Sequence, residues 1–238
     1  MAKSKNIKTF TYAKAPYKRG GGSKALIAAR RAAGQPGLRG RFSGADAPEL
    51  KFFDTDVNFT VDATPEVPAT GQLCLIPQGV TESTRVGRKC CIKSIQINGL
   101  LQQTPAAATS SASLISIVMV QDTQANGAAA APADVYDIGG TVLPVSVRNI
   151  ENSSRFKILK RWDVVLSSSA GVSAAYNNVL RKWDFYTKCT IPLEFSSTTG
   201  AIGELKTNNV FLLAGSNGVA ADDTVTVLAK CRLRYSDM

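Results

Sequence analysis

The residues that could do bond-making chemistry in this chain are few and poorly matched to one another. Asp54 and Asp56 fall on one face of an expected strand, about 7 Å apart by strand geometry. Such a pair of carboxylates could share a proton, as in a glycosidase or a nuclease. Nothing near them in the sequence supplies a catalytic partner, and the chain has no histidine. Ser-His-Asp and Cys-His mechanisms and the usual zinc sites all need histidine, so we expect a protein that is not an enzyme.

Two other groups of side chains could hold a metal ion or form covalent links. Asp222 and Asp223 stand side by side before the last expected strand. A cation shared there between subunits would need further oxygen ligands, so a pair of turn aspartates is the preferred interpretation. The five cysteines form no CxxC pair and are Cys74, Cys90, Cys91, Cys189 and Cys231. An odd number without a secretion signal favours reduced, buried thiols, and we predict no metal, no cofactor and no membrane segment.

Positive charge is concentrated at one end of the chain. The sequence carries 28 Lys and Arg against 18 Asp and Glu, a formal net charge of +10. Residues 1–41 contain eleven of these cations and no acidic residue, so the remainder of the chain is close to neutral. The cations are Lys3, Lys5, Lys8, Lys14, Lys18, Arg19, Lys24, Arg30, Arg31, Arg39 and Arg41. A segment of this kind repels itself, does not condense unaided, and attracts a polyanion such as nucleic acid.

The basic segment also has features that suit single-stranded nucleic acid. Each Lys or Arg beside a phosphate releases condensed counterions, and Phe10, Tyr12 and Tyr17 could stack on unpaired bases. The pattern over residues 24–33 predicts a short helix, which at this length forms mainly on a partner. We therefore predict a disordered basic arm over residues 1–43 that binds nucleic acid. The alternative is a tail that only solubilises or targets the protein.

From Pro48 onward the hydrophobic pattern is that of β-strands. Apolar residues alternate with polar ones, or run continuously, in eight segments. These segments are 50–61, 73–76, 89–101, 114–120, 156–166, 183–193, 209–214 and 224–235. In the fifth segment we expect Phe156, Ile158, Trp162 and Leu166 to share one face. Eight strands, uneven connections and no convincing long helix predict an all-β fold, an eight-stranded jelly roll of two antiparallel sheets over residues 44–238.

Three strings of sequence, taken in order with the arm, indicate a family. They are Glu49-Leu50-Lys51-Phe52-Phe53-Asp54-Thr55, Arg88-Lys89-Cys90-Cys91-Ile92-Lys93-Ser94-Ile95-Gln96, and Glu151-Asn152-Ser153-Ser154-Arg155-Phe156-Lys157-Ile158-Leu159-Lys160-Arg161. With them the chain resembles the capsid proteins of small circular single-stranded DNA viruses that encode a replication initiator. The resemblance implies a closed icosahedral (T=1) shell, most simply of sixty copies, with the arms inside on the genome. It also implies that the arm acts as a nuclear entry signal.

Two strand faces add basic residues outside the arm. These are Arg155, Lys157 and Arg161 in one strand and Lys230, Arg232 and Arg234 in another. In a shell they could line the inner surface against the genome. The alternative is an ordinary solvated face, or ion pairs with a neighbouring subunit.

The sequence thus predicts a self-assembling capsid protein found in the virion and, during assembly, in the host nucleus. Its expected partners are further copies of itself and single-stranded nucleic acid, with DNA favoured over RNA. We expect no small-molecule substrate. Two alternatives stay open, namely a capsid protein of a small or satellite single-stranded RNA virus and a non-viral nucleic-acid-binding β-sandwich oligomer.

Overall fold

A computed structural model of the chain describes residues 49–105, 112–139, 142–167, 179–217 and 223–238. The chain divides into two units, Met1–Ala47 and Pro48–Met238, and all described residues belong to the second. The predicted arm, its helix over residues 24–33 and its basic and aromatic side chains therefore lie outside the described residues. Over the described part, no helix is long and apolar enough to cross a membrane.

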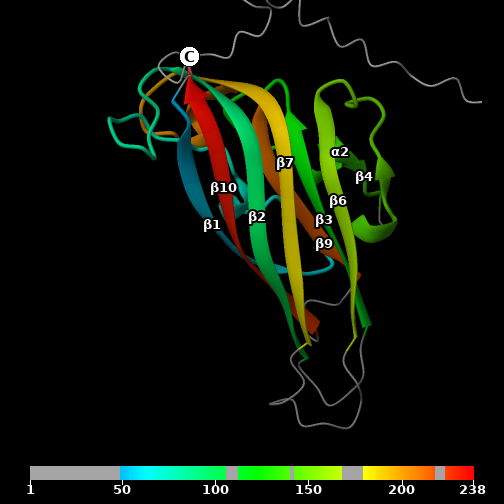
Figure 1. The fold of residues 1–238 in the computed structure, drawn as a ribbon. Helices are drawn as coiled ribbons and strands as arrows, with labels where there is room; N and C mark the ends of the chain where they lie inside the picture. Colours follow the sequence, from blue (N-terminus) through cyan, green and yellow to red (C-terminus); the bar gives the residue numbers. More distant parts are fainter. Residues whose placement is uncertain (1–48, 106–111, 140–141, 168–178, 218–222) are drawn as a thin grey trace, which may run out of the picture. The chain divides into compact units, whose positions relative to one another are not determined.

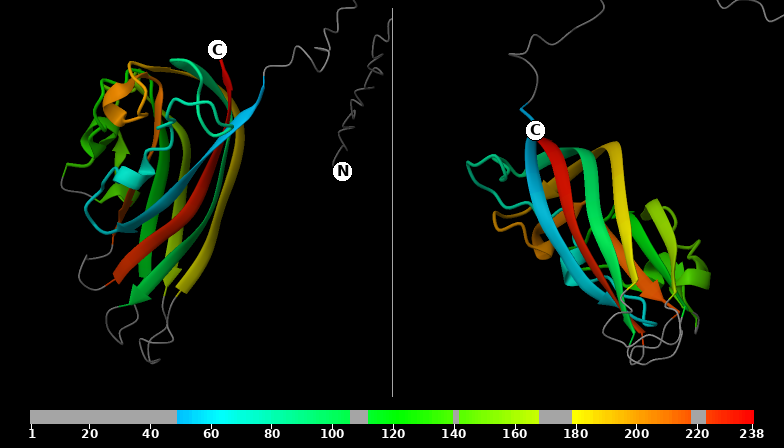
Figure 2. Two further views of the ribbon diagram at one scale, coloured as in Figure 1. Left: turned by 90° about the vertical axis from the view of Figure 1, so that its left-hand side faces the viewer. Right: turned by 60° about the horizontal axis from the view of Figure 1, so that its bottom comes forward.

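Two antiparallel sheets form the second unit (Figures 1 and 2). The five-stranded sheet has the order β1 (Lys51–Val61), β10 (Asp223–Asp237), β2 (Lys89–Pro105), β7 (Val179–Phe195) and β8 (Leu205–Thr207). The three-stranded sheet has the order β6 (Phe156–Ser167), β3 (Ala112–Asp122) and β9 (Asn209–Ser216). Strands distant in sequence pair with each other, as a jelly roll requires. The prediction of an all-β jelly roll with two antiparallel sheets is confirmed.

The remaining elements are short and were not expected from the sequence. They are β4 (Tyr136–Asp137), β5 (Val147–Arg148), the helix α2 (Pro132–Val135) and the 3-10 turns η1 (Ala69–Gly71), η2 (Leu143–Val145) and η4 (Ile202–Glu204). β4 pairs with β5 in a ladder of two residue pairs. Most of these elements belong to the connection between β3 and β6, which spans residues 123–155.

One predicted strand, over residues 73–76, does not form a regular ladder. The segment is mostly buried, and Leu73 N donates a hydrogen bond of 3.0 Å to the Val210 carbonyl oxygen of β9. Just before it, Glu66 and Gln72 form isolated bridges with Ala214 and Phe211 of the same strand. Prolines at positions 65, 68 and 77 explain the difference, because a proline cannot donate a ladder hydrogen bond. The segment therefore occupies the place of a fourth strand in the smaller sheet without being one.

The main core lies between the two sheets. Alternate residues such as Ile95, Ile97 and Val227 from the larger sheet meet Ile117 and Leu212 from the smaller one, and all are fully buried. This arrangement is what the period-two pattern predicts, because every second side chain points to the same face.

A second core covers the opposite face of the three-stranded sheet. Val118, Val120 and Phe211 point away from the main core and are buried by Tyr136 and Leu143 of the 123–155 connection. β3 is thus buried on both faces, as its continuously apolar sequence predicts. The second core stabilises the connection as well as the sheet.

The prediction that alternate residues of the segment 156–166 share a single face is wrong. A β-bulge shifts the register of β6 at Leu159, so that Met119 lies opposite Lys160 while Val120 lies opposite Ile158. One extra residue exchanges the two faces of a strand. Phe156 and Ile158 consequently pack in the second core, whereas Trp162, Val164 and Leu166 pack toward the main core.

Candidate nucleic-acid interface

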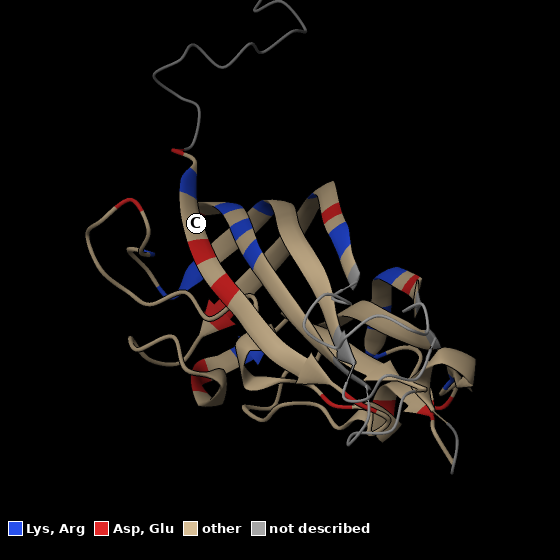
Figure 3. Cartoon of the chain, turned by 90° about the horizontal axis from the view of Figure 1, so that it is seen from below, with Lys and Arg blue, Asp and Glu red and all other residues tan. Residues whose placement is uncertain are grey.

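The outward face of the five-stranded sheet is a broad polar surface on four paired strands. The registers of β1, β10, β2 and β7 align their outward side chains in rows across the sheet. Successive rows are Phe52-Arg234-Ser94-Lys188, Asp54-Arg232-Gln96-Tyr186, Asp56-Lys230-Asn98-Asp184 and Asn58-Leu228-Leu100-Lys182. Figure 3 shows acidic and basic residues on these strands near the C-terminus. We call this surface the open sheet face.

Ion pairs between neighbouring strands neutralise the middle of the open sheet face. The Arg232 guanidinium donates two hydrogen bonds of 2.7 Å to the Asp54 carboxylate, and Lys230 Nζ lies 3.3 Å from Asp56 Oδ1. The hydrogen bond from Arg232 holds the pKa of Asp54 below its usual value. Each aspartate is thus paired with a cation of β10 and not with the other aspartate, which leaves no support for an acid–base pair of carboxylates.

The uncompensated positive charge of this face lies in one row. Arg234 and Lys188 are exposed and flank Ser94 across β10, β2 and β7, and the row contains no acidic residue. Within the part of the chain that the structure describes, neither cation forms an ion pair. The first member of the row, Phe52, is the second residue of β1, the strand that directly follows the arm in the sequence. We call this row the basic row.

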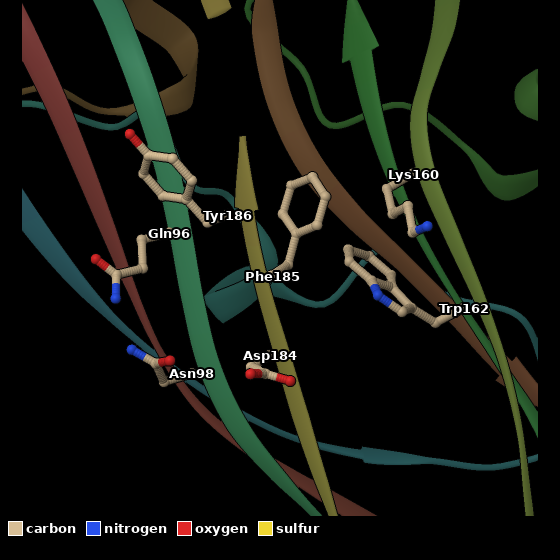
Figure 4. Close-up of a pocket in the computed structure, with 7 residues that line it drawn as sticks. All are labelled: Gln96, Asn98, Lys160, Trp162, Asp184, Phe185 and Tyr186. Atoms are coloured by element: carbon tan, nitrogen blue, oxygen red, sulfur yellow. The ribbon is translucent and has the colours of Figure 1, made fainter. Parts of the chain in front are cut away.

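A hollow of about 480 Å³ opens beside the basic row, at the edge of β7 (Figure 4). Its walls are Gln96, Asn98, Asp184 and Tyr186 from the open sheet face, with Phe185, Trp162 and Lys160 at the gap between β7 and β6. The Tyr186 ring is 58% exposed and so is accessible from solvent. An exposed ring next to two amides suits stacking and hydrogen bonding of an unpaired base.

Aromatic packing fixes the inner wall of this hollow. The Trp162 ring lies edge-on to the rings of Trp183 and Phe185, each with centroids 5.2 Å apart. Gly99 makes room for this arrangement, because a Cβ at that position would lie 2.7 Å from the Trp183 indole. The hollow is therefore a feature built on a rigid aromatic cluster.

The basic residues predicted on the other strand, Arg155, Lys157 and Arg161, do not lie on the open sheet face and have another role. Arg155 donates two hydrogen bonds of 2.8 Å to the buried carboxylate of Asp122, which raises the pKa of the arginine. Arg161 donates to Asp163 and to the Pro144 carbonyl oxygen at 2.8 Å. Both arginines hold the 123–155 connection against the three-stranded sheet. The structure therefore does not bring these two arginines together with Lys230, Arg232 and Arg234. Of Arg155, Lys157 and Arg161, only Lys157 is exposed.

The cysteines and the Asp222–Asp223 pair make no site in the described residues. Cys74, Cys90, Cys91 and Cys231 are buried free thiols, as predicted, whereas Cys189 is half-buried. Burial raises the pKa of Cys90 and Cys231 to about 12. Asp222 lies outside the described residues, and Asp223 is the first residue of β10. Across the described ranges, no three His, Cys, Asp or Glu side chains gather closely enough to hold a metal ion.

Sequence reasoning missed Lys188, Tyr186, Gln96 and Asn98 as members of one surface. Tyr186 and Lys188 alternate in the predicted strand 183–193, so their common face was available from the pattern. What the pattern could not provide is the register, which places Tyr186 opposite Gln96 and Lys188 opposite Ser94.

Comparison with known proteins identifies the family. Residues 8–238 match the Geminivirus coat protein/nuclear export factor BR1 family. The chain belongs to this family. It is also 30% identical, over 123 aligned residues, to a capsid protein of Miscanthus streak virus (isolate 91). The aligned region covers 45% of this chain and 47% of that protein. The matched region thus spans about half the length of that curated relative.

Membership of the geminivirus coat protein family confirms the resemblance drawn from the three sequence strings. The chain is a viral capsid protein of the circular single-stranded DNA virus type, with a structural role and not an enzymatic one.

Proposed function

We propose that this coat protein assembles into a small icosahedral shell, most simply of sixty copies, and packages single-stranded DNA through its N-terminal arm. The segregation of charge carries the proposal. Eleven cations without one acidic residue precede a nearly neutral β-domain, and the domain belongs to a coat protein family. Sixty arms would bring about 660 positive charges to the interior, enough to neutralise a large share of a small genome.

The basic row adds further positive charge on the folded domain. Arg234 and Lys188 have no acidic neighbour in their row, and β1 joins the arm to the sheet at the same row. A strand of nucleic acid on the open sheet face would contact these two cations and, beside them, the hollow with the exposed Tyr186 ring. Stacking on Phe10, Tyr12, Tyr17 and Tyr186 favours unpaired bases over a duplex.

The arm also serves, in this proposal, as the signal that brings the coat protein into the host nucleus. Its eleven cations form the kind of basic stretch that nuclear import uses. A fluorescent fusion of the full chain should accumulate in the nuclei of cells that express it, and a fusion that lacks residues 2–41 should not. Equal nuclear accumulation of both fusions would assign entry to another part of the chain.

Deletion of residues 2–41 tests the packaging proposal. The predicted strands all lie beyond the deletion, so the β-domain should remain folded, as judged by circular dichroism. Particles of the truncated protein should show a clear fall in the ratio of absorbance at 260 and 280 nm. An unchanged ratio would move the main binding surface from the arm to the open sheet face. Sequencing of the packaged nucleic acid distinguishes DNA from RNA.

A further inference from the structure

A rigid loop presents an exposed valine at one side of the domain. The loop spans residues 77–88, and Val80 near its tip is 96% exposed. Arg85 fixes the loop from within. Its side chain is fully buried and donates hydrogen bonds to the carbonyl oxygens of Ile76 at 3.0 Å, of Gly87 at 2.5 Å and of Ser197. We call this segment the Val80 loop.

Further contacts leave the Val80 loop little freedom. The Arg85 guanidinium stacks on the Phe195 ring at 4.1 Å, and Gly79 N donates to the Arg85 carbonyl oxygen at 2.9 Å. Lys51 Nζ donates to the Thr84 carbonyl oxygen at 3.1 Å, which ties the loop to β1. Burial of a guanidinium that makes no ion pair among the described residues is unfavourable unless its hydrogen bonds are well made. Here these hydrogen bonds hold a loop whose tip presents Val80, an apolar side chain that is almost fully exposed.

A groove lined by both apolar and charged residues lies at another side of the same domain. β4, β5 and the residues after them form a groove of about 460 Å³. Val147 and Ile150 at its rim are 67% and 81% exposed, and Tyr136 and Ile138 line it from within. We call it the β4–β5 groove. Exposed apolar residues that gather at a groove in this way mark contact sites with other proteins.

The two features lie apart within one chain, and each carries charged residues beside its exposed apolar ones. The Val80 loop lies beside β1, whereas β4 lies beyond β6 at the other side of the sandwich (Figure 1). The loop carries exposed Glu82 and Arg88, and the groove carries Arg148 together with exposed Asp137 and Glu151. A contact between two different patches is heterologous, and rotational symmetry above two-fold, which an icosahedral shell contains, needs contacts of this type.

We propose that the Val80 loop of one copy docks into the β4–β5 groove of a neighbouring copy, an inference that rests on the proposed assembly into a shell. Val80 enters the groove against Val147 and Ile150, where an apolar side chain loses contact with water. Because Arg85 already orders the loop in the single chain, little conformational entropy is lost when two copies meet.

Site-directed cross-linking of the full-length chain tests the contact. In a Cys189→Ser background, the native thiols that remain are buried, so cysteines introduced by Val80→Cys and Ile150→Cys are the accessible ones. A short bis-maleimide should link chains that carry V80C to chains that carry I150C when the two are mixed under assembly conditions. It should leave either chain alone essentially unlinked. A chain with both substitutions should give a ladder of covalent oligomers rather than a dimer. V80C with Val165→Cys is the matched control, because Val165 is 59% exposed but lies outside the groove.

The outcomes separate this inference from the proposed function. A ladder for V80C with I150C, at least ten-fold stronger than for the control pair, supports the docking. If shells are visible by electron microscopy and the two pairs cross-link equally, the docking is wrong while the shell stands. If the uncross-linked parent stays monomeric under all conditions, the shell and the docking are both overturned.

Discussion

The two sheets differ in what covers their outward faces. The outer face of the three-stranded sheet is covered by the 123–155 connection and forms a second core, whereas the open sheet face has no such cover in the described residues. Arginines occur on both. Arg155 binds a buried carboxylate and holds the connection, while Arg232 binds a half-buried carboxylate of the neighbouring strand. Both arginines thus stabilise the fold through a carboxylate, but only the open sheet face also carries cations without an ion pair among the described residues, Arg234 and Lys188.

The largest expected difference between the two faces is the loss of free energy of unfolding when an aromatic side chain is truncated. Phe156→Ala empties a buried site in the second core and should lower the free energy of unfolding by about 3–5 kcal/mol. Phe52→Ala removes a 38% exposed ring from the open sheet face and should cost less than about 1 kcal/mol. Urea denaturation of both variants measures the difference. Equal losses would mean that the 123–155 connection does not form a core.

Removal of a carboxylate should show the same contrast on a smaller scale. Asp122→Ala leaves Arg155 and the Gln124 amide without their acceptor and should cost about 2–3 kcal/mol. Asp56→Ala removes the partner of an exposed Lys230 and should produce no loss that denaturation resolves. A large loss for the second variant would indicate that the open sheet face is also covered in the folded chain.

The basic row should contribute a modest, countable share of nucleic-acid binding. Substitution of both Arg234 and Lys188 by Ala should make the log–log salt slope for a single-stranded oligonucleotide shallower by about 1.4, that is 0.7 for each lost phosphate contact. Lys230→Ala is the matched control, because this lysine is already paired with Asp56. An equal change of slope in the control would remove any special role of the basic row.

Lowering the pH should remove the small stabilisation that the Arg232–Asp54 ion pair gives on the open sheet face. Arg232 lowers the pKa of Asp54 in the folded protein from the usual 3.8, so the pair stabilises the fold fully above about pH 4. As the pH falls through the lowered pKa, the carboxylate takes up a proton and this stabilisation disappears. Asp54→Asn should therefore be less stable than the parent at pH 6 and nearly equal to it at the lowest pH at which both fold. A stability difference that grows on acidification has the wrong sign for this pair.

The sequence predicted the strands well because most of them are long and half-buried, which produces a clear period of two. It failed where tertiary packing overrides the local pattern. Leu159 is an ordinary apolar residue in an alternating run, and nothing in that run reveals the bulge opposite Met119 and Val120. The second core was missed because the 123–155 connection has little periodicity of its own.

The site was predictable in charge but not in geometry. Lys230, Arg232 and Arg234 alternate along one strand, and their common face follows from that alone. Their different roles depend on the partner strand: Asp54 and Asp56 of β1 lie opposite Arg232 and Lys230, while Arg234 lies opposite Phe52. Arg85 could not be identified from its type or neighbours, because a buried arginine without an ion pair is rare.

Electron microscopy of the recombinant full-length protein, combined with light scattering, tests the central claim most directly. A coat protein that closes on itself should form uniform spherical particles whose mass corresponds to sixty copies of the 25.2 kDa chain. A protein that stays a stable monomer across salt and pH conditions would contradict the account.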